Sequence, residues 1–325
     1  MLLSIVMPML LGFAIFLAGM KLMELALHRF AGPHLARVLR RSTSTPIHGL
    51  VVGTAASAVL QSSTAVTVIT IGLVNARLLT FSRTLGIVLG TNVGTCLTTE
   101  LIGLNLSRWS MPLTLMSLAL WLLTALLGEM RLIPAAYSMP WLAPLRSLSL
   151  VLCGFGLLLF GIAMMQSIGP AVQSSSMFSW FVNRADDSLL WGVAAGTVMT
   201  AIVHSSAAVI AMMMGLATIG AIPPELGIAV ILGSNIGTCF TALLASLGGS
   251  KPGQFVAWSH IALNAGGAIL FLPLIGELTA VSDWISATPS SMLAHAQTLF
   301  NVACSLIALP LCYLPIMQRL DQREG

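Results

Sequence analysis

Two short polar clusters interrupt long apolar stretches of this chain, and their side chains are suited to binding ions. Amide and hydroxyl oxygens are neutral ligands for a hard cation such as sodium, and hydroxyls also donate hydrogen bonds to an anion such as phosphate. The clusters lie within "SAVLQSSTAVTVITIGL" and "TAIVHSSAAVIAMMMGL", at an offset of 143 positions. The candidate binding residues are Gln61, Ser62, Ser63 and Thr64 in the first cluster and His204, Ser205 and Ser206 in the second.

A second pair of polar motifs follows the clusters, "GTNVGT" from Gly90 and "GSNIGT" from Gly233. Two glycines that flank an asparagine inside an apolar span predict a broken helix, which would bring amides and hydroxyls toward the clusters. Close helix packing also explains the glycines, but it does not explain the repeated asparagine. These motifs add Thr91, Asn92, Thr95, Ser234, Asn235 and Thr238. We expect a hard cation such as sodium to bind among Gln61, Ser62, Asn92, Ser205 and Asn235.

The two sets of motifs belong to one internal repeat. "LGTNVGTCLT" from Leu89 aligns without a gap with "LGSNIGTCFT" from Leu232, and Gly53-Thr54 aligns with Gly196-Thr197 at the same offset. The preceding apolar runs, "GFAIFLAGMKLM" and "GFGLLLFGIAMM", also agree. We therefore expect transmembrane repeats at residues 1–130 and 131–325, the second with an extra C-terminal span. Such repeats are typical of secondary transporters.

The composition indicates an integral membrane protein. Hydrophobic residues make up 57% of the chain and charged residues only 7%, whereas soluble domains carry about 25% charged residues. Long apolar runs without the alternation of a membrane barrel predict an all-α fold. The net charge of +4 does not indicate nucleic-acid binding, because the basic residues lie between the apolar runs. Spans are expected near 2–27, 85–106, 110–129, 147–168, 227–248, 255–276 and 293–315.

The segments that carry the clusters, 47–75 and 190–216, are expected to be re-entrant helical hairpins that enter and leave on one side. With this arrangement most basic residues share one face, which the charge bias makes cytoplasmic. The N-terminus is then outside, the C-terminus is cytoplasmic, and the repeats have inverted topology in the cell membrane. The residues on the basic face are Arg29, Arg37, Arg40, Arg41, Arg77, Arg83, Arg131, Arg146, Lys251, Arg319 and Arg323.

Each hairpin tip is expected near the bilayer midplane, where one short helix ends and another begins. The C-terminal end of a helix offers unpaired carbonyls to a cation, and the N-terminal end offers N–H groups to an anion. A hydroxyl that bonds back to its own helix is the simpler explanation for a lone Ser-Ser pair. Two clusters at equal places in an inverted repeat favour ion binding instead.

Two Gln-Ser-Ser-like hairpins, each followed by a Gly-x-Asn-Ile/Val-Gly-Thr span, resemble the type II sodium-phosphate cotransporter family and its bacterial relatives. The resemblance implies sodium-driven uptake of inorganic phosphate, with both ions bound between the hairpins and with no further cofactor. "HIALN" and "QTLFN" also resemble His-x-x-x-Asn segments of the family. The resemblance therefore adds His260, Asn264 and Asn301 as weaker candidates.

Several positions depart from the family pattern. His204 stands where the family usually has Gln, Ala207 replaces a common third hydroxyl, and Gln297 stands where His is expected. A literal Gln-Ser-Ser-Ser begins at Gln173, but it is out of register with the repeat. No C-terminal regulatory domain is expected after Arg319, which leaves a separate regulatory protein as a candidate partner.

Other functions stay open at this point. Transport of another anion, or proton coupling through His204 or Glu100, is the nearest alternative, since an acid within a span is a functional candidate. An intramembrane hydrolase is disfavoured, because adjacent residues such as His204 and Ser205 do not face each other on a helix as base and nucleophile must. A channel or a receptor is a further class.

Overall fold

The computed structural model describes residues 2–129, 141–248 and 250–315, and every regular element in these ranges is a helix. Within them, seven helical stretches are long and apolar enough to cross a membrane, and each predicted span overlaps one of these, with ends that differ by a few residues. An all-α membrane fold is therefore confirmed. The stretches are Met7–Ala31, Phe81–Gly103, Ser107–Leu127, Leu142–Ser167, Pro224–Ser246, Lys251–Ile285 and Pro289–Tyr313.

The chain divides into two compact units, each drawn from both halves of the sequence. The first unit comprises Met1–Pro33 and Leu106–Val172, and the second comprises His34–Asn105 and Gln173–Gly325. The predicted repeat boundary near 130 falls outside the described residues. Helix α1 (Leu2–Ser42) crosses from one unit into the other, and the first unit also holds η1 (Ser107–Trp109), α5 (Ser110–Glu129), α7 (Leu142–Ser167) and most of α8 (Gly169–Gln173).

In the first unit, α1 and α7 approach each other at matched glycines. A Cβ added to Gly19 would lie 2.5 Å from the carbonyl oxygen of Gly154, and one added to Gly161 would lie 2.5 Å from that of Gly12. Only residues without a side chain allow backbones this close. The two aligned apolar runs of the sequence are thus packed against each other.

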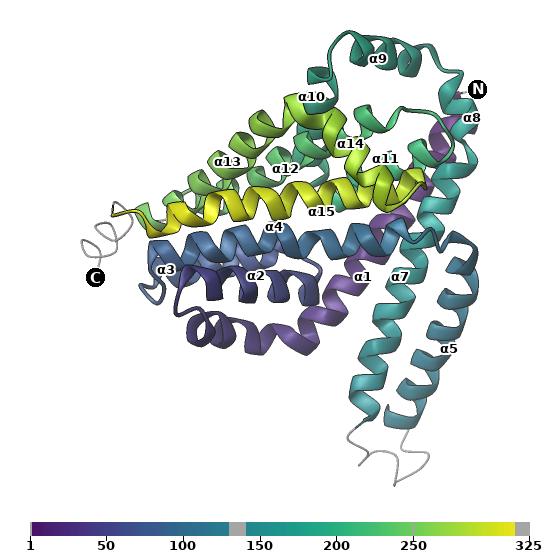
Figure 1. The fold of residues 1–325 in the computed structure, drawn as a ribbon. Helices are drawn as coiled ribbons and strands as arrows, with labels where there is room; N and C mark the ends of the chain where they lie inside the picture. Colours follow the sequence, from purple (N-terminus) through teal and green to yellow (C-terminus); the bar gives the residue numbers. More distant parts are fainter. Residues whose placement is uncertain (1, 130–140, 249, 316–325) are drawn as a thin grey trace. The chain divides into compact units, whose positions relative to one another are not determined.

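The second unit contains both hairpins and the longer helices around them (Figure 1). Among the described residues, the first half supplies one hairpin and one span, and the second half supplies the other hairpin, five further α-helices and two short 3-10 helices. The elements are α2 (Pro46–Leu60), α3 (Ser63–Asn75), α4 (Phe81–Gly103), α9 (Ser176–Asp187), α10 (Leu190–Val203), α11 (Ser206–Thr218), α12 (Pro224–Ser246), α13 (Lys251–Phe271), η2 (Leu272–Leu274), α14 (Ile275–Ile285), α15 (Pro289–Ala308) and η3 (Leu309–Tyr313).

Both predicted hairpins are present as pairs of short helices. Thr45 caps α2 by accepting a hydrogen bond from the His48 N–H at 3.3 Å, and Pro46 occupies the first turn, where its missing N–H costs nothing. With 15 residues, α2 extends about 22 Å, which is short of the roughly 30 Å of a bilayer core. A membrane entry and exit on one side remains a prediction that these lengths favour.

The prediction of broken helices at Asn92 and Asn235 is wrong. α4 and α12 are continuous α-helices through both motifs. Their glycines instead admit the hairpins: a Cβ added to Gly94 would meet the carbonyl oxygen of Thr54, and one added to Gly237 would lie 2.5 Å from that of Thr197. Close packing, the alternative explanation of these glycines, is therefore the correct one.

The two halves of the second unit run in opposite directions. At the base of the first hairpin, the Ser250 hydroxyl donates to the Asn75 side chain at 2.5 Å, so the C-terminal end of α12 lies near the start of α4. At the other end of α4, Gly103 packs against Met214 of the second hairpin. The hairpins therefore enter this unit from opposite ends, which favours the predicted inverted repeats.

Candidate functional site

The two hairpin tips have the same backbone conformation. Gln61 ends α2 with φ 54° and ψ 29°, and His204 ends α10 with φ 57° and ψ 25°. The next residues are extended and cap the second helices: Ser62 accepts from the Ala65 N–H at 3.3 Å, and Ser205 accepts from the Ala208 N–H at 3.2 Å. The sequence repeat is thus also a repeat of an unusual local geometry.

Each tip contacts a threonine that was not among the predicted site residues. The Thr98 hydroxyl on α4 donates to Gln61 Oε1 at 2.5 Å, while Gln61 Nε2 donates to the Ala58 carbonyl at 2.5 Å. In the second repeat, His204 Nδ1 lies 3.4 Å from the hydroxyl of Thr241, which is the repeat mate of Thr98. His204 therefore makes the equivalent contact to that of Gln61, at a longer distance. The two threonines end the matched "CLT" and "CFT" of the aligned motifs, so the sequence repeat could have identified them as a pair.

The tips do not lie at the middle of the neighbouring spans. Asn92 is the central residue of α4, and Thr98 lies six residues beyond it, about 9 Å along the helix axis. Thr241 lies equally far beyond the central Asn235 of α12. Because the two helices are antiparallel, the tips are displaced toward opposite ends, and other polar side chains occupy the centre.

Asn92, at the centre of α4, is bonded to two side chains of α13. Asn92 Nδ2 donates to Asn264 Oδ1 at 3.0 Å, and Asn92 Oδ1 lies 3.1 Å from His260 Nε2. His260 and Asn264 are 2% and 3% exposed. Two residues that the family resemblance suggested only weakly are thus the direct partners of Asn92.

A related arrangement joins α15 to α4. Asn301 Nδ2 lies 3.4 Å from Cys96 Sγ and 3.1 Å from the Gln297 carbonyl, and Asn264 Nδ2 lies 3.3 Å from Cys239 Sγ and 3.0 Å from the His260 carbonyl. Cys96 and Cys239 are repeat mates. The segments "HIALN" and "QTLFN" therefore occupy equivalent places against α12 and α4.

Several predicted residues bond to their own helices instead of facing the tips. The hydroxyls of Thr91, Thr95 and Thr238 donate to carbonyls three or four residues earlier, and Asn235 Nδ2 donates to the Ile231 carbonyl at 2.9 Å. Ser63 and Thr64 are half-buried and Ser206 is buried, all three at the tips. The structure thus joins Gln61 to α4 and Asn92 to α13, but it does not bring the other candidates into one cluster.

The central region contains buried polar atoms that no described residue satisfies. They are Ser234 Oγ, His260 Nδ1 and Gln297 Oε1, with Thr67 Oγ1 and Thr200 Oγ1 on the hairpins. A buried polar atom without a partner costs about 1–3 kcal/mol, so such atoms are rare in the absence of a ligand or water. These five atoms lie in the second unit, whereas a sixth such atom among the described residues, Trp121 Nε1, lies on α5 in the first unit. The second unit is therefore the better candidate for a site that receives a polar ligand.

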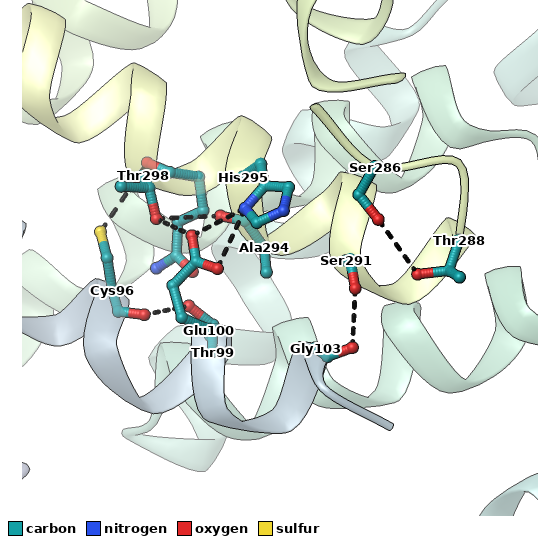
Figure 2. A network of polar contacts seen from close by, with 11 residues as sticks. Cys96, Thr99, Glu100, Gly103, Ser286, Thr288, Ser291, Ala294, His295 and Thr298 are labelled. Atoms are coloured by element: carbon teal, nitrogen blue, oxygen red, sulfur yellow. Dashed lines mark hydrogen bonds and ion pairs between the residues drawn. The ribbon is translucent and has the colours of Figure 1, made fainter. Parts of the chain in front are cut away.

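Glu100 has its own set of partners, on α15. Its carboxylate lies 3.0 Å from His295 Nδ1 and accepts from the Thr298 hydroxyl at 2.5 Å (Figure 2). Neither His295 nor Thr298 was predicted, because nothing in the sequence spacing connects α15 to Glu100. This acid is therefore a paired group inside a candidate span.

Comparisons with known proteins agree with this architecture. The family model described as Na+/Pi-cotransporter matches the chain twice, at residues 15–167 and 168–311. An uncharacterised protein of Bacillus subtilis, YqeW, is 32% identical over 299 residues, which cover 92% of each chain. No solved structure matches.

More distant relatives are named as putative inorganic phosphate export proteins YjbB. The protein from Salmonella typhimurium is 24% identical over 95% of this chain, and the one from Escherichia coli is 24% identical over 91%. The chain spans about half the length of these relatives, 54% and 52% respectively. The matches of the family model extend over nearly all of the chain, and the chain belongs to the Na+/Pi-cotransporter family.

Proposed function

We propose that this protein is a secondary transporter that couples the movement of sodium to that of inorganic phosphate. The observation that carries the proposal is the duplicated tip, where a side chain in the left-handed region is followed by a serine cap in both repeats. Membership in a transporter family sets the class and disfavours the hydrolase alternative.

The two kinds of helix end at a tip suit ions of opposite charge. The C-terminal ends of α2 and α10 present carbonyls, which together with Gln61 and the neighbouring hydroxyls form an oxygen-rich place for sodium. The N-terminal ends of α3 and α11 present N–H groups and the positive end of the helix dipole, which attract phosphate. Asn92 and His260 lie between the levels of the tips, where they can donate to an anion that passes.

The packing favours movement of each hairpin together with its span. A Cβ added to Gly53 would lie 2.5 Å from the carbonyl oxygen of Ile87, so the backbones of α2 and α4 touch directly. Such an interface has little room to slide, because interiors are close-packed. We propose that alternating access moves the hairpin and span of one repeat against those of the other.

The proposal also fixes an orientation in the cell membrane. Charge bias places the base of the first hairpin on the cytoplasmic side, the N-terminus outside and the C-terminus inside. An inward sodium gradient then drives phosphate uptake. The names of the YjbB relatives favour export as the rival direction.

Uptake of labelled phosphate into proteoliposomes tests the function. An inward sodium gradient should accelerate uptake over equal potassium, and unlabelled sulfate should compete much less than phosphate. Uptake without any effect of sodium would contradict the coupling, and stronger competition by another anion would contradict the substrate. Reversing the gradient in vesicles of known orientation decides between uptake and export.

A matched pair of variants tests the site. Gln61→Ala removes a ligand at a tip, whereas Gln173→Ala makes the same change in the literal Gln-Ser-Ser-Ser that lies outside the repeat. Losing a hydrogen bond to a charged partner costs about 1.5–3 kcal/mol, or roughly ten- to a hundredfold in affinity. We expect that loss in Gln61→Ala alone; equal transport by the two variants would remove Gln61 from the site.

A further inference from the structure

The carboxylate of Glu100 lies at the contact between α4 and α15, and the network around it contains more than an ion pair. His295 Nδ1 lies 3.2 Å from Oε1 and 3.0 Å from Oε2, so one N–H faces both carboxylate oxygens. The Thr298 hydroxyl lies 2.5 Å from Oε1 and 3.1 Å from the Ala294 carbonyl. Figure 2 shows the carboxylate between the imidazole and this hydroxyl.

The Thr298 hydroxyl has one proton and two neighbouring acceptors, so it can serve two protonation states of Glu100. When Glu100 is ionised, Thr298 donates to Oε1 and His295 Nδ1–H donates to Oε2. When Glu100 carries a proton, its O–H donates to Thr298 Oγ1, and Thr298 turns to donate to the Ala294 carbonyl. Both states satisfy all these groups, and the change needs only the rotation of one hydroxyl.

The site also has access for a proton. The side chains of His295 and Glu100 are 25% and 29% exposed, although both residues lie in candidate spans. The partly exposed imidazole of His295 can pass a proton between water and the carboxylate. A net charge inside a membrane span is costly. If Glu100 is ionised and His295 is neutral, the pair carries one negative charge, and binding one proton neutralises it.

The site exists in one half of the repeat only. Leu243 stands at the repeat mate of Glu100. Aligning "HIALN" with "QTLFN" places Trp258 opposite His295 and Ile261 opposite Thr298. None of the three polar groups is duplicated, so any proton held here is a single one per chain, unlike ligands that the two tips would share.

We propose that Glu100, His295 and Thr298 form a binding site for one exchangeable proton that is linked to the transport cycle. Binding transfers one proton from hydronium in the adjoining water to the Glu100 carboxylate: one O–H bond of hydronium breaks, one O–H bond forms on Glu100, and release reverses both changes. The linkage rests on the proposed function. The linkage is inferred from the position of Glu100. This residue lies two positions after Thr98, and the turn of the helix therefore places it on nearly the opposite side of α4. One turn of α4 therefore holds a hairpin tip on one side and α15 on the other.

Other titratable groups near this contact are few in the described part of the chain. Cys96 lies one turn before Glu100, and α11, which packs on both helices, has no titratable side chain. On α12, Glu225 lies in the first turn, close to the point where Gly227 meets Leu293 of α15. Glu277 and Asp283 on α14 are exposed, and His260 on α13 is engaged with Asn92.

Infrared difference spectroscopy of the purified protein over a series of pH values tests proton binding without any transport. We expect a protonated-carboxyl band in the wild type and in the control Glu277→Gln, and its loss in Glu100→Gln. His295→Gln and Thr298→Val, which keep the acid, should shift the midpoint of that band. Identical spectra for the wild type and Glu100→Gln, or an unshifted midpoint in both other variants, would overturn the site.

Phosphate transport by the same proteins tests the linkage. Taking the ratio of wild-type to variant rates at each pH cancels the titration of phosphate itself. Because occupancy of a single required proton changes by up to tenfold per pH unit, the ratio to Glu100→Gln should change by about tenfold between pH 5.5 and 7.5. The ratio to Glu277→Gln should stay constant. A constant ratio to Glu100→Gln would overturn the linkage; if no phosphate moves under any condition, the proposed function fails and the carboxyl band alone decides the proton site.

Discussion

Replacing Gln61 with glycine separates the structural role of this residue from its role in binding. Gln61 has φ 54°, in the left-handed region where a side chain costs about 1–2 kcal/mol and glycine costs almost nothing. Against that gain, Gln61→Gly loses the Thr98 hydrogen bond, worth about 0.5–1.5 kcal/mol, and adds about 0.4–1 kcal/mol of unfolded-chain entropy. These contributions nearly cancel, so we expect little change in the free energy of unfolding.

Transport should respond very differently, because glycine offers no amide to an ion. We expect a thermal melting temperature within about 4 °C of the wild type, together with a roughly ten- to a hundredfold loss of sodium affinity. Gln61→Ala provides the comparison: it loses the same amide but keeps the backbone cost, so it should be less stable than Gln61→Gly by about 1 kcal/mol. Normal sodium affinity in the glycine variant, or an alanine variant as stable as the glycine one, would refute the reasoning.

The remaining predictions concern His204, the topology and the glycine contacts. His204→Gln should shorten the 3.4 Å contact with Thr241 and strengthen sodium binding, measured as sodium affinity in uptake; an unchanged affinity would show that position 204 does not bind the cation. Cysteines placed at positions 40 and 187 should be labelled from opposite sides of intact cells, and labelling from one side would contradict the inverted hairpins. Gly53→Ala should lower the melting temperature, because its Cβ would lie 2.5 Å from the Ile87 carbonyl oxygen, whereas Gly72→Ala, with open space around it, should not; equal melting temperatures would contradict the close contact of α2 and α4.

The sequence was a good guide to the elements of this fold and a weaker one to their contacts. Hydropathy located the seven candidate spans, because a run of about 20 apolar residues reflects the thickness of the bilayer directly. The repeat located both tips, since only a shared backbone geometry explains equal polar clusters at equal places. The matched glycines of α4 and α12 were misread, because glycine permits both a helix break and a close approach, and spacing along one helix does not distinguish them.

The contacts of the site depend on which helices become neighbours, and the sequence holds little information about that. Thr98 was missed although it lies inside an aligned motif, because threonines on apolar helices usually bond to their own backbone. His295 and Thr298 were beyond prediction: they meet Glu100 across nearly two hundred positions, without a counterpart in the other repeat. By contrast, "HIALN" and "QTLFN" were recognisable as a pair, and that pair proved to pack equivalently.

The shortness of the hairpin helices has a consequence for how this protein enters a membrane during synthesis. A nascent chain that ends after α3 carries 15- and 13-residue helices whose tip exposes backbone groups that lipid cannot satisfy. Such a segment has no stable place in the bilayer until α4 follows and brings its glycine face and Thr98. We therefore expect insertion of each hairpin to wait for the span made after it, and a released chain truncated before residue 81 to hold the hairpin outside the hydrocarbon core.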